Sequence, residues 1–445
     1  MTGEAGERRR AAAAALAAAV AHLPSLGGAF QFDDHNVIVN EPAIRSGSAL
    51  LAALAGGVRP LLKASYALNW ALGPGPAGFH AFNIAVHALN AALIYGIGRR
   101  LCGRWLGEER APGAALAAAL LFALHPAQTE AVTYVCGRSS SLMASFYLGA
   151  ALLYLRGASV LAAAALFVLA LSVKEAAITL PAAFLLFDGR LARRQAPAWL
   201  AAAAALLAMG LSARYRDLLS YGFTQRGMLD NLLTQVNGVW YLLARLTTLR
   251  GFNIDPGLPE LSAWTPALAV QAGALAALLA LGFSSLRRRP ELGFGILWFF
   301  LQLAPTNSFV PRLDPANDRQ LYLACWGPFL ALAVAASRAL PPLRARAAAG
   351  IVLAAFAVAS VARQLDYRSE IRLWEASVRE APENARARNN LGHAYQEAGR
   401  REEALEQYRA ALRLRPDYTK AGVNLRLLEW ESAGKTIDNH PSREE

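Results

Sequence analysis

The sequence is poor in charge and in cysteine for its length. Only 17% of its 445 residues are charged, whereas soluble proteins average about 25%. Its three cysteines, Cys102, Cys136 and Cys325, lie far apart and form neither a CxxC pair nor a disulfide framework. The motifs G-x-x-x-x-G-K-[ST] and H-E-x-x-H are missing, and no G-x-G-x-x-G stands in a βαβ setting. These absences exclude the soluble nucleotide-dependent enzymes and zinc proteases that carry such motifs.

Apolar residues dominate instead. They make up 55% of the chain, and the mean hydropathy is +0.28. Runs of roughly 17–25 apolar residues recur from end to end, and a helix of that length crosses the hydrocarbon core of a bilayer. We therefore expect an all-α, polytopic helical membrane protein with about eleven transmembrane helices. The expected spans lie near residues 11–29, 79–98, 112–125, 139–155, 158–173, 176–188, 197–213, 264–283, 291–305, 320–337 and 347–362.

Arginine is unevenly distributed along this predicted bundle. The net charge is +12, but lysine occurs at only four positions and arginine gathers in short loops between apolar runs. Positive-inside sorting explains this distribution without a nucleic-acid partner. The short loops and the Arg- and Ala-rich composition favour a bacterial inner membrane. The rule places the C-terminus outside, and it places in the cytoplasm the N-terminus and the Arg-rich loops 99–110, 190–194, 287–289 and 338–346.

Two apolar segments need separate treatment. Residues 11–29 follow three arginines, as in a signal peptide, but no A-x-A cleavage site follows and the run has the length of a span. We therefore expect an uncleaved first helix. Residues 232–249 contain Gln235, Asn237 and Arg245, and a span there would move Arg287–Arg289 to the wrong side. This segment predicts an interfacial helix on the outer surface.

The C-terminal part has a different composition. Residues 363–433 are charged and helical, and we separate them from a membrane domain at 1–362 and a disordered tail at 434–445. The sequence after Asp417 predicts a polar capping helix. The module is expected to act as a spacer or dimerisation element, or to bind an extended peptide of a protein partner. Tetratricopeptide-repeat spacing is visible in 385–418 at Leu391, Gly392, Tyr395, Ala404, Tyr408, Ala411 and Pro416.

Several polar residues of different loops fall on the outer side of this topology. His80, Asn83, His87 and Asn90 share one helical face, where interhelical hydrogen bonding is the alternative to a functional role. Glu130 and Arg138 could likewise form only a neutralising pair. The candidate substrate-binding residues are His35, His80, His125, Glu130, Arg138, Lys174, Glu175, Asp318, Arg319 and Tyr322.

A set of motifs resembles a known family. "FDDHNVIVNEP", "RPLLKASYALNWALG", "FALHPAQTEAVTYVCGRSSSLMASFYL" and "SVKEAAITLPAAFLLFD", followed by tetratricopeptide repeats, resemble the TMTC-like glycosyltransferases of the GT-C superfamily. These include protein O-mannosyltransferases. The resemblance implies that a sugar, with mannose favoured, moves outside the membrane from a polyprenyl-phosphate carrier to a hydroxyl of a protein or glycan. It also implies a catalytic acidic residue in the first outer loop, which is Asp33 or Asp34.

The residue types fit this chemistry. A carboxylate can take the proton of an attacking hydroxyl, and two neighbouring carboxylates raise the pKa of one of them. Asp34 is the first choice for this base, although the pattern does not separate it from Asp33. Arg138, Lys174 and Arg319 are the candidate cations for the departing phosphate. A divalent metal ion that bridges carboxylate and phosphate stays open.

Two other functions fit parts of the sequence. A transporter of lipid-linked sugars would also carry polar residues within its spans. It would favour two repeated halves with broken helices, and the membrane part contains no internal repeat. A non-catalytic scaffold could recruit envelope proteins through its repeats, and it would tolerate changes at Asp33 and Asp34.

Overall fold

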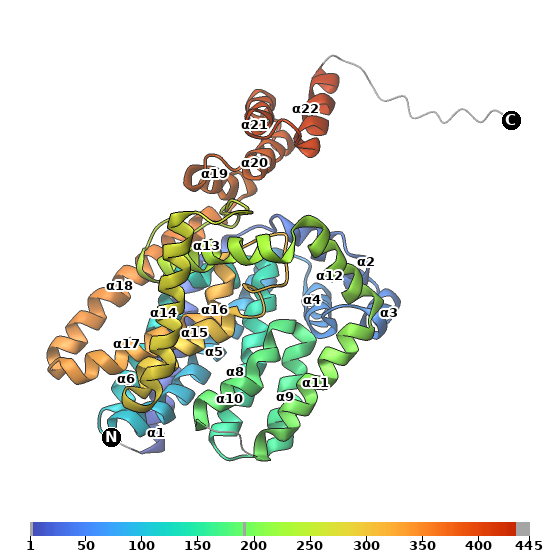
Figure 1. Cartoon of the computed structure of the whole chain (residues 1–445). Helices are drawn as coiled ribbons and strands as arrows, with labels where there is room; N and C mark the ends of the chain where they lie inside the picture. Colours follow the sequence, from blue (N-terminus) through green and yellow to red (C-terminus); the bar gives the residue numbers. More distant parts are fainter. Residues whose placement is uncertain (1–2, 190–192, 433–445) are drawn as a thin grey trace. The chain divides into compact units, whose positions relative to one another are not determined.

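The fold is all-α, as the sequence predicts. A computed structural model describes residues 3–189 and 193–432, and every regular element of these residues is a helix (Figure 1). The chain divides into two compact units. The first unit contains Met1–Phe252 and Leu258–Arg368, and the second contains Asn253–Gly257 and Ser369–Glu445.

The centre of the first unit is one long helix and the helices packed on it. Helix α5 (Pro76–Leu106) contacts α1 (Glu4–His22), α6 (Ala111–Leu124) and α8 (Arg138–Leu155). The alanine-rich sequence has a role here, because small side chains let helix backbones approach closely. On α6 the fully or almost fully buried alanines are Ala111, Ala114, Ala115, Ala118, Ala119 and Ala123.

The remaining helices of the first unit surround this centre. Close approach recurs where α15 crosses α17, because a Cβ on Gly295 would lie 2.9 Å from the Gly327 carbonyl oxygen. The bounds are α2 (Pro42–Arg45), α3 (Gly47–Gly56), α4 (Pro60–Leu72), α7 (Thr129–Val132), α9 (Val160–Val173), α10 (Leu180–Asp188), α11 (Ala196–Leu211), α12 (Ala213–Gln225), α13 (Met228–Thr247), α14 (Pro266–Arg288), α15 (Pro290–Leu303), α16 (Leu321–Ala324), α17 (Trp326–Ala339) and α18 (Pro342–Asp366).

Fewer helices qualify as candidate membrane spans than the sequence predicts. Among the described residues, three helices (α5, α14 and α18) are long and apolar enough to cross a membrane, or up to six spans if each of three bent helix pairs counts as one. Every predicted apolar segment coincides with a helix, but several are short, such as the nine residues of α10. Others break inside the apolar run, with bends of 51° to 77°. Composition reveals an apolar run but not such a break, so the count of eleven is not confirmed.

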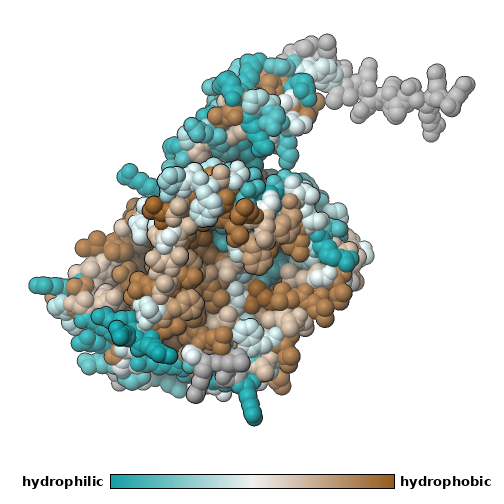
Figure 2. Space-filling view, viewed as in Figure 1, coloured by the Kyte–Doolittle hydropathy of each residue, from teal (hydrophilic) through white to brown (hydrophobic). Residues whose placement is uncertain are grey.

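Apolar side chains cover much of the outside of the first unit. Leu200 on α11, Val270 on α14 and Ile351 on α18 are 70%, 73% and 72% exposed. Figure 2 shows the resulting hydrophobic surface over α11 and α14. Soluble proteins rarely expose so many large apolar residues on several helices, and lipid is the solvent that matches them.

The Arg-rich loops meet at one end of the first unit. Arg338 pairs with Glu291 and donates to the Trp105 carbonyl oxygen at 3.0 Å, while Arg110 donates to the Ser337 carbonyl oxygen at 3.2 Å. We call this the Arg338 end, which also includes Arg99 and Arg104. Arg190 of the predicted loop 190–194 falls in 190–192, outside the described residues. The loops predicted for one side thus do gather, and their cytoplasmic orientation stays a prediction.

The opposite end of the first unit carries the predicted outer residues. Helix α5 has 31 residues and is therefore about 46 Å long. Gly28 lies against His80 near its start, whereas Arg99 and Arg104 lie in its last two turns. We call the end with Asp33, Lys174 and Arg319 the Asp33 end.

The predicted interfacial segment is a helix that packs on protein. On α13 the side chains of Leu233, Val239 and Leu242 are buried, and the last two contribute to an apolar cluster with Phe252 and Leu303. The apolar face of this helix is therefore used inside the first unit. A period-3.6 pattern predicts an apolar face but does not say whether lipid or protein covers it.

The second unit contains the predicted repeat. Its helices are α19 (Glu370–Glu380), α20 (Ala385–Glu397), α21 (Arg401–Leu414) and α22 (Thr419–Ser432). A Cβ on Gly392 would lie 2.7 Å from the Tyr408 ring, so the small residue is required where α20 meets α21. The segment Asn253–Gly257 joins this unit because Asp255 accepts two hydrogen bonds from Arg386, at 2.5 and 2.6 Å. Nothing in the sequence pattern predicted that contact.

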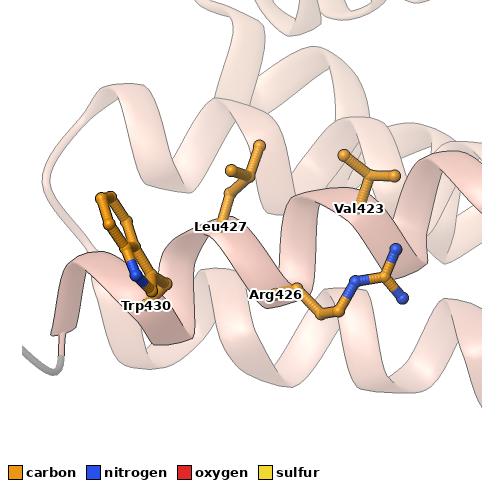
Figure 3. Close-up of a pocket in the computed structure, with 4 residues that line it drawn as sticks. All are labelled: Val423, Arg426, Leu427 and Trp430. Atoms are coloured by element: carbon orange, nitrogen blue, oxygen red, sulfur yellow. The ribbon is translucent and has the colours of Figure 1, made fainter. Parts of the chain in front are cut away.

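The last described helix is less polar than predicted. On α22, Val423 and Leu427 are 39% and 45% exposed. With Arg426 and Trp430 they line a shallow hollow of about 350 Å³ (Figure 3). Helix α22 packs on α21, where Leu428 is buried, as expected of a cap. Its outer surface differs from the predicted polar one, because Val423 and Leu427 face outward. The predicted tail 434–445 lies outside the described residues.

Candidate active site

The first loop after α1 makes a sharp turn at the two aspartates. Phe32, just before them, has a φ of +51°, a left-handed conformation that is uncommon for a residue with a side chain. Because such a conformation persists only when its surroundings hold it, it points to a fixed geometry for the following residues. Asp34 and His35 then begin a short helical turn that ends at Val39.

Asp34 is buried and bound to the backbone. Its Oδ1 accepts the Cys136 backbone N–H at 2.8 Å, and its Oδ2 accepts the Gln31 backbone N–H at 3.1 Å. The side chain therefore ties the first loop to the segment between α7 and α8. Burial raises the pKa of Asp34 to about 7, helped by the charge of Asp33 and opposed by these hydrogen bonds.

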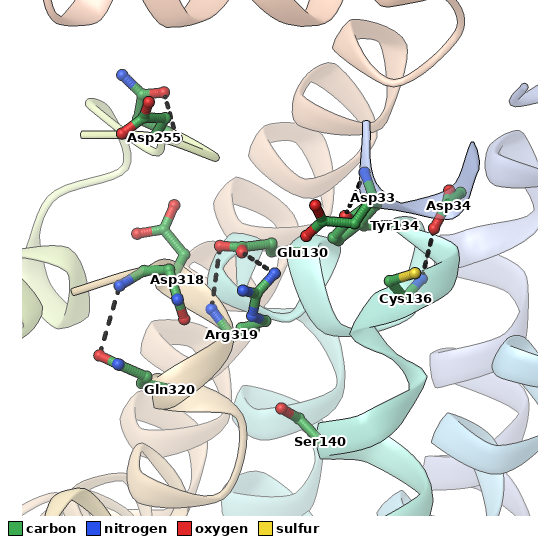
Figure 4. A network of polar contacts seen from close by, with 12 residues as sticks. Asp33, Asp34, Glu130, Tyr134, Cys136, Ser140, Asp255, Asp318, Arg319 and Gln320 are labelled. Atoms are coloured by element: carbon green, nitrogen blue, oxygen red, sulfur yellow. Dashed lines mark hydrogen bonds and ion pairs between the residues drawn. The ribbon is translucent and has the colours of Figure 1, made fainter. Parts of the chain in front are cut away.

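Asp33 has different surroundings. Its residue is half-buried, and its backbone N–H donates to the Tyr134 hydroxyl at 3.2 Å. Figure 4 shows Asp33 beside Tyr134, on the side of Glu130 and Arg319, whereas Asp34 points to Cys136. Arg319 interacts electrostatically with Asp33 and lies over the Tyr134 ring at 5.8 Å from its centre. Of the two aspartates, Asp33 thus lies on the side of the other charged groups.

Arg319 is clamped by Glu130. Its backbone N–H donates to Glu130 Oε2 at 3.1 Å, and its Nη1 lies 3.3 Å from Glu130 Oε1. Glu130 is 2% exposed, so this pair neutralises a buried carboxylate. The preceding Asp318 is also buried and accepts the Tyr241 hydroxyl at 2.9 Å. Glu130 therefore pairs with Arg319, which lies 189 residues later in the sequence, and not with Arg138.

Three further cations, Arg59, Lys174 and Arg312, interact electrostatically with Arg319. Lys174 is buried and donates to the Ser140 hydroxyl at 2.8 Å. Burial lowers the pKa of Lys174 well below its usual value, and the charges of Arg312, Arg59 and Arg319 lower it further. Burial and the charges of Arg319 and Arg59 also lower the pKa of Arg312, to about 10. We call Arg59, Lys174, Arg312 and Arg319 the cation cluster. Like charges that lower one another's pKa inside a protein favour an anion between them.

Glu175 anchors one side of the cation cluster. Arg59 binds it through Nε at 3.0 Å and Nη2 at 2.7 Å, and the Tyr215 hydroxyl donates at 3.0 Å. Burial alone would raise the pKa of Glu175, but the charge and hydrogen bonds of Arg59 lower it to about 2. Sequence reasoning missed Arg59 as a site residue. Its signal was available, because it begins the quoted motif "RPLLKASYALNWALG" beside a proline that starts a helix.

Other predicted residues lie in the core. Arg138 is fully buried, and its guanidinium donates to the Asn83 side chain at 2.7 Å and to the carbonyl oxygens of Ser65 and Phe79. It also lies 4.3 Å from the centre of the Phe82 ring. Arg138, at the start of α8, is therefore bonded to α4 and α5. It does not belong to the cation cluster.

The histidines and Tyr322 are also accounted for. His125 is buried against the Phe356 and Phe329 rings, and its Nδ1 accepts the Ala127 backbone N–H. His80 is buried against Gly28, and His35 is exposed on the first loop. Tyr322 is held by Asn90 and His87 at 2.9 and 2.8 Å, which realises the interhelical hydrogen bonding considered from the sequence.

The space at the cation cluster is small in this state. A cavity of about 20 Å³, enough for about one water molecule, is lined by Ser140, Lys174, Arg319 and Tyr322 among others. Within residues 3–189 and 193–432, no three His, Cys, Asp or Glu side chains come together as metal ligands. The arrangement therefore offers a carboxylate, Asp33, on one side and fixed cations on the other.

Known proteins match both parts of the chain. The tetratricopeptide-repeat family model matches residues 385–418. Protein O-mannosyl-transferase F38B6.6 of Caenorhabditis elegans is 24% identical over 438 residues, which cover 90% of this chain and 62% of the relative. The chain is a relative of the protein O-mannosyl-transferases. The resemblance seen in its motifs is thereby confirmed.

Two further relatives show how the similarity is distributed. Protein O-mannosyl-transferase TMTC1 of Homo sapiens is 26% identical over 513 aligned residues, which cover 95% of this chain and 57% of the relative. Protein O-mannosyl-transferase TMTC4 of Mus musculus is 34% identical over 146 residues, 28% of this chain and 20% of the relative. The chain thus spans less than two thirds of the length of these relatives.

Proposed function

We propose that this protein is a membrane glycosyltransferase of the GT-C type that moves a sugar, with mannose favoured, from a polyprenyl-phosphate carrier to a hydroxyl. The observation that carries the proposal is the cation cluster at the same end of the first unit as Asp33. Sugar transfer from a lipid phosphate needs both parts, because one proton leaves the acceptor while negative charge develops on the phosphate.

Asp33 is the proposed general base. A base must reach the acceptor hydroxyl, and Asp33 is half-buried on the side of Glu130 and Arg319. Asp34, the first choice from the sequence, already receives two backbone N–H groups and is 1% exposed. We therefore give Asp34 a positioning role: it fixes the loop that presents Asp33.

The cation cluster is the proposed phosphate site. A phosphate oxygen between Lys174, Arg312 and Arg319 would replace the mutual repulsion of these cations by attraction. Arg312 and Arg319 can grip phosphate oxygens in the bidentate manner of guanidinium groups, and Lys174 adds a point charge. Glu175 holds Arg59 in place from the side. Glu130 does the same for Arg319.

A metal ion remains a separate proposal with its own test. A divalent ion between donor phosphate and Asp33 would draw few ligands from the described residues, where no three acidic or His/Cys side chains converge. The cation cluster already supplies positive charge for the phosphate, so no step here runs through a metal. The transfer assay below is therefore run with EDTA and with added Mg²⁺, and only a loss of transfer in EDTA that Mg²⁺ restores would assign a metal.

The setting of the reaction follows from the same proposal. We place the Asp33 end outside a bacterial inner membrane, with about eleven spans in total and the second unit on the same side. The acceptor is a protein Ser/Thr hydroxyl or a glycan, and the repeats contact a protein partner. The apolar surface of α11, α14 and α18 supports the membrane setting, and the family match to a tetratricopeptide repeat supports the protein contact.

The decisive experiment is sugar transfer by the purified full chain in detergent. Radiolabelled polyprenyl-phosphate-mannose is the donor, and a membrane extract supplies the acceptors. We expect Asp33→Asn to lower the transfer rate by about 10²–10⁴-fold, the usual contribution of a general base. Asp34→Asn serves as the matched control, with a smaller loss of rate and a lower thermal stability.

The outcomes separate the candidate functions. Equal rates in wild type and Asp33→Asn would remove Asp33 as the base. If a panel of lipid-linked sugars gives no transfer with folded wild type, the scaffold function is favoured. If the protein moves the labelled lipid across the membrane of proteoliposomes but transfers no sugar, the transporter function is favoured.

A further inference from the structure

Helix α12 leaves the apolar outer surface at a steep angle. Helix α11 carries exposed leucines up to Leu211, and α12 begins two residues later at Ala213. The two helices together form one of the bent pairs that could be a broken span or a re-entrant loop. The two helices are bent by 77° relative to each other (Figure 1). If α11 runs across a bilayer, a helix that starts at its end at this angle lies nearly parallel to the membrane surface.

One side of α12 is fixed to the loops of the candidate active site. The Tyr215 hydroxyl donates to Glu175 Oε1 at 3.0 Å. Two turns later, a Cβ on Gly222 would lie 2.6 Å from the Pro311 carbonyl oxygen, so the α12 backbone rests directly on the residue before Arg312. Tyr215 and Gly222 are seven residues apart and share one helical face. Helix α12 therefore holds two of the loops that carry the cation cluster.

The flanks of α12 are apolar and exposed. Leu218 and Tyr221 are both 57% exposed, and Leu219 and Phe223 are 39% and 44% exposed. At 3.6 residues per turn, these four positions lie on either side of the face that contacts the protein. Asp217, Ser220 and Thr224 lie opposite that face and are exposed too. Apolar flanks below a polar ridge are the pattern of a helix at the boundary between acyl chains and water.

We propose that α12 is an interfacial helix whose flanks insert into the phospholipid headgroup region at the Asp33 end, where it positions Glu175 and Arg312. The occupant of this surface is lipid, because the exposed leucines of α11 continue up to Leu211, two residues before α12 begins. The exposed Arg214 and Arg216 at the start of α12 suit lipid phosphates. The lipid contact does not depend on the proposed function. The positioning of the cation cluster, in contrast, rests on the proposed function.

The test measures lipid contact directly. Leu218→Cys and Tyr221→Cys are labelled with a nitroxide in full-length protein in nanodiscs of palmitoyl-oleoyl phosphatidylcholine. Ser220→Cys and Thr224→Cys are the matched controls on the polar ridge of the same helix. Wild type, whose Cys102 and Cys325 are buried and whose Cys136 is half-buried, is carried through the labelling to give the background.

We expect oxygen, which concentrates in lipid, to relax the labels at 218 and 221 more than a water-soluble nickel chelate does. The ratio of relaxation by oxygen to relaxation by the nickel chelate should be lower at positions 220 and 224. Equal ratios at all four positions would overturn the proposal, as would water-like ratios at 218 and 221. A protein partner on this surface would instead shield the labels from both reagents. Because no enzyme activity is measured, failure here is distinguishable from failure of the glycosyltransferase proposal.

The positioning role has its own readout. Tyr215→Phe removes only the hydrogen bond to Glu175, and Tyr221→Phe is the control on the exposed flank of the same helix. We expect Tyr215→Phe to raise the KM for the lipid donor while kcat changes less, and Tyr221→Phe to leave both constants unchanged. Equal constants for Tyr215→Phe and wild type would overturn the positioning role and leave the lipid contact to the labelling experiment.

Discussion

The Arg338 end and the Asp33 end of the first unit carry similar charged residues in different surroundings. At the Arg338 end, Arg99 reaches Glu7 and Glu108 and Arg338 reaches Glu291, while Arg104 and Arg110 donate to carbonyl oxygens. At the Asp33 end, Arg59 and Arg319 also reach carboxylates. Lys174 differs: it is 7% exposed, donates to the Ser140 hydroxyl, and is acted on by the charges of the three arginines of the cation cluster. The arginines named at the first end each have an acceptor, whereas the second end adds a buried lysine close to arginines.

This difference separates two roles of arginine in one membrane protein. Arginines that are exposed or individually paired cost little and set orientation in the bilayer. Cations that repel one another while buried are unfavourable in the free protein, and such an arrangement persists where a ligand needs it. The comparison makes opposite predictions for the two ends: a cation removed from the Asp33 end costs activity, and one removed from the Arg338 end costs stability.

The largest effect is expected for Lys174→Met. Loss of a cation that faces the developing phosphate charge should lower kcat/KM for the lipid donor by about 10²–10³-fold. Thermal stability should stay equal or rise, because methionine fills a similar volume and the repulsion from Arg59, Arg312 and Arg319 is relieved. Transfer kinetics and a thermal melt in the same detergent measure both quantities.

Arg338→Met is the matched control at the other end. It leaves Glu291, which is 4% exposed, without its guanidinium partner, so the melting temperature should fall while transfer by the folded fraction is unchanged. If Lys174→Met lost stability and kept its transfer rate, the distinction between the two ends would be wrong.

The second effect concerns the two aspartates. Asp34→Ala removes the acceptor of the Cys136 and Gln31 backbone N–H groups, both inside the protein. Unpaired buried donors are costly, so the free energy of unfolding should fall by about 2–3 kcal/mol. Asp33→Ala, at a half-buried position, should cost less than about 1 kcal/mol. A larger loss for Asp33→Ala than for Asp34→Ala would contradict the structural role given to Asp34.

A third and smaller effect depends on pH. The pKa of Glu175 is lowered from 4.5 to about 2 in the folded protein, so the folded state favours the carboxylate. Its contribution to stability is complete above about pH 4.5 and is lost as the pH falls towards 2. Glu175→Gln should be less stable than wild type at pH 7 by about 2 kcal/mol, because hydrogen bonds to a charged group are lost. The two melting temperatures should converge as the pH falls through this window; parallel curves would show that Glu175 is not the group that titrates.

The sequence predicted composition-driven features better than contacts. Apolar runs located the helices, and the spacing of residues within 385–418 located the repeat, because both depend on local periodicity. It also brought Lys174, Glu175 and Arg319 to one end. It did not distinguish Asp33 from Asp34, since adjacent residues share every local signal. Contacts with residues about a hundred positions away separate them: Asp34 accepts the Cys136 backbone N–H, whereas the Asp33 backbone N–H donates to the Tyr134 hydroxyl. Arg138 was a candidate for binding phosphate because its partners on α4 and α5 are also distant in sequence. Only the packing of the helices brings these partners to it.

The smallest effect is expected for Arg8→Ala. Arg8 pairs with Glu4 at 3.2 Å, but the two side chains are 82% and 89% exposed. Water screens such a pair almost completely, so neither the melting temperature nor the transfer rate should change measurably. The variant tests whether loss of charge alone destabilises the Arg338 end, because it removes a charge near that end without leaving a buried partner. A clear loss of stability in Arg8→Ala would mean that exposed charge also holds the fold together, and the costs at Arg338 would then not be attributable to the burial of Glu291.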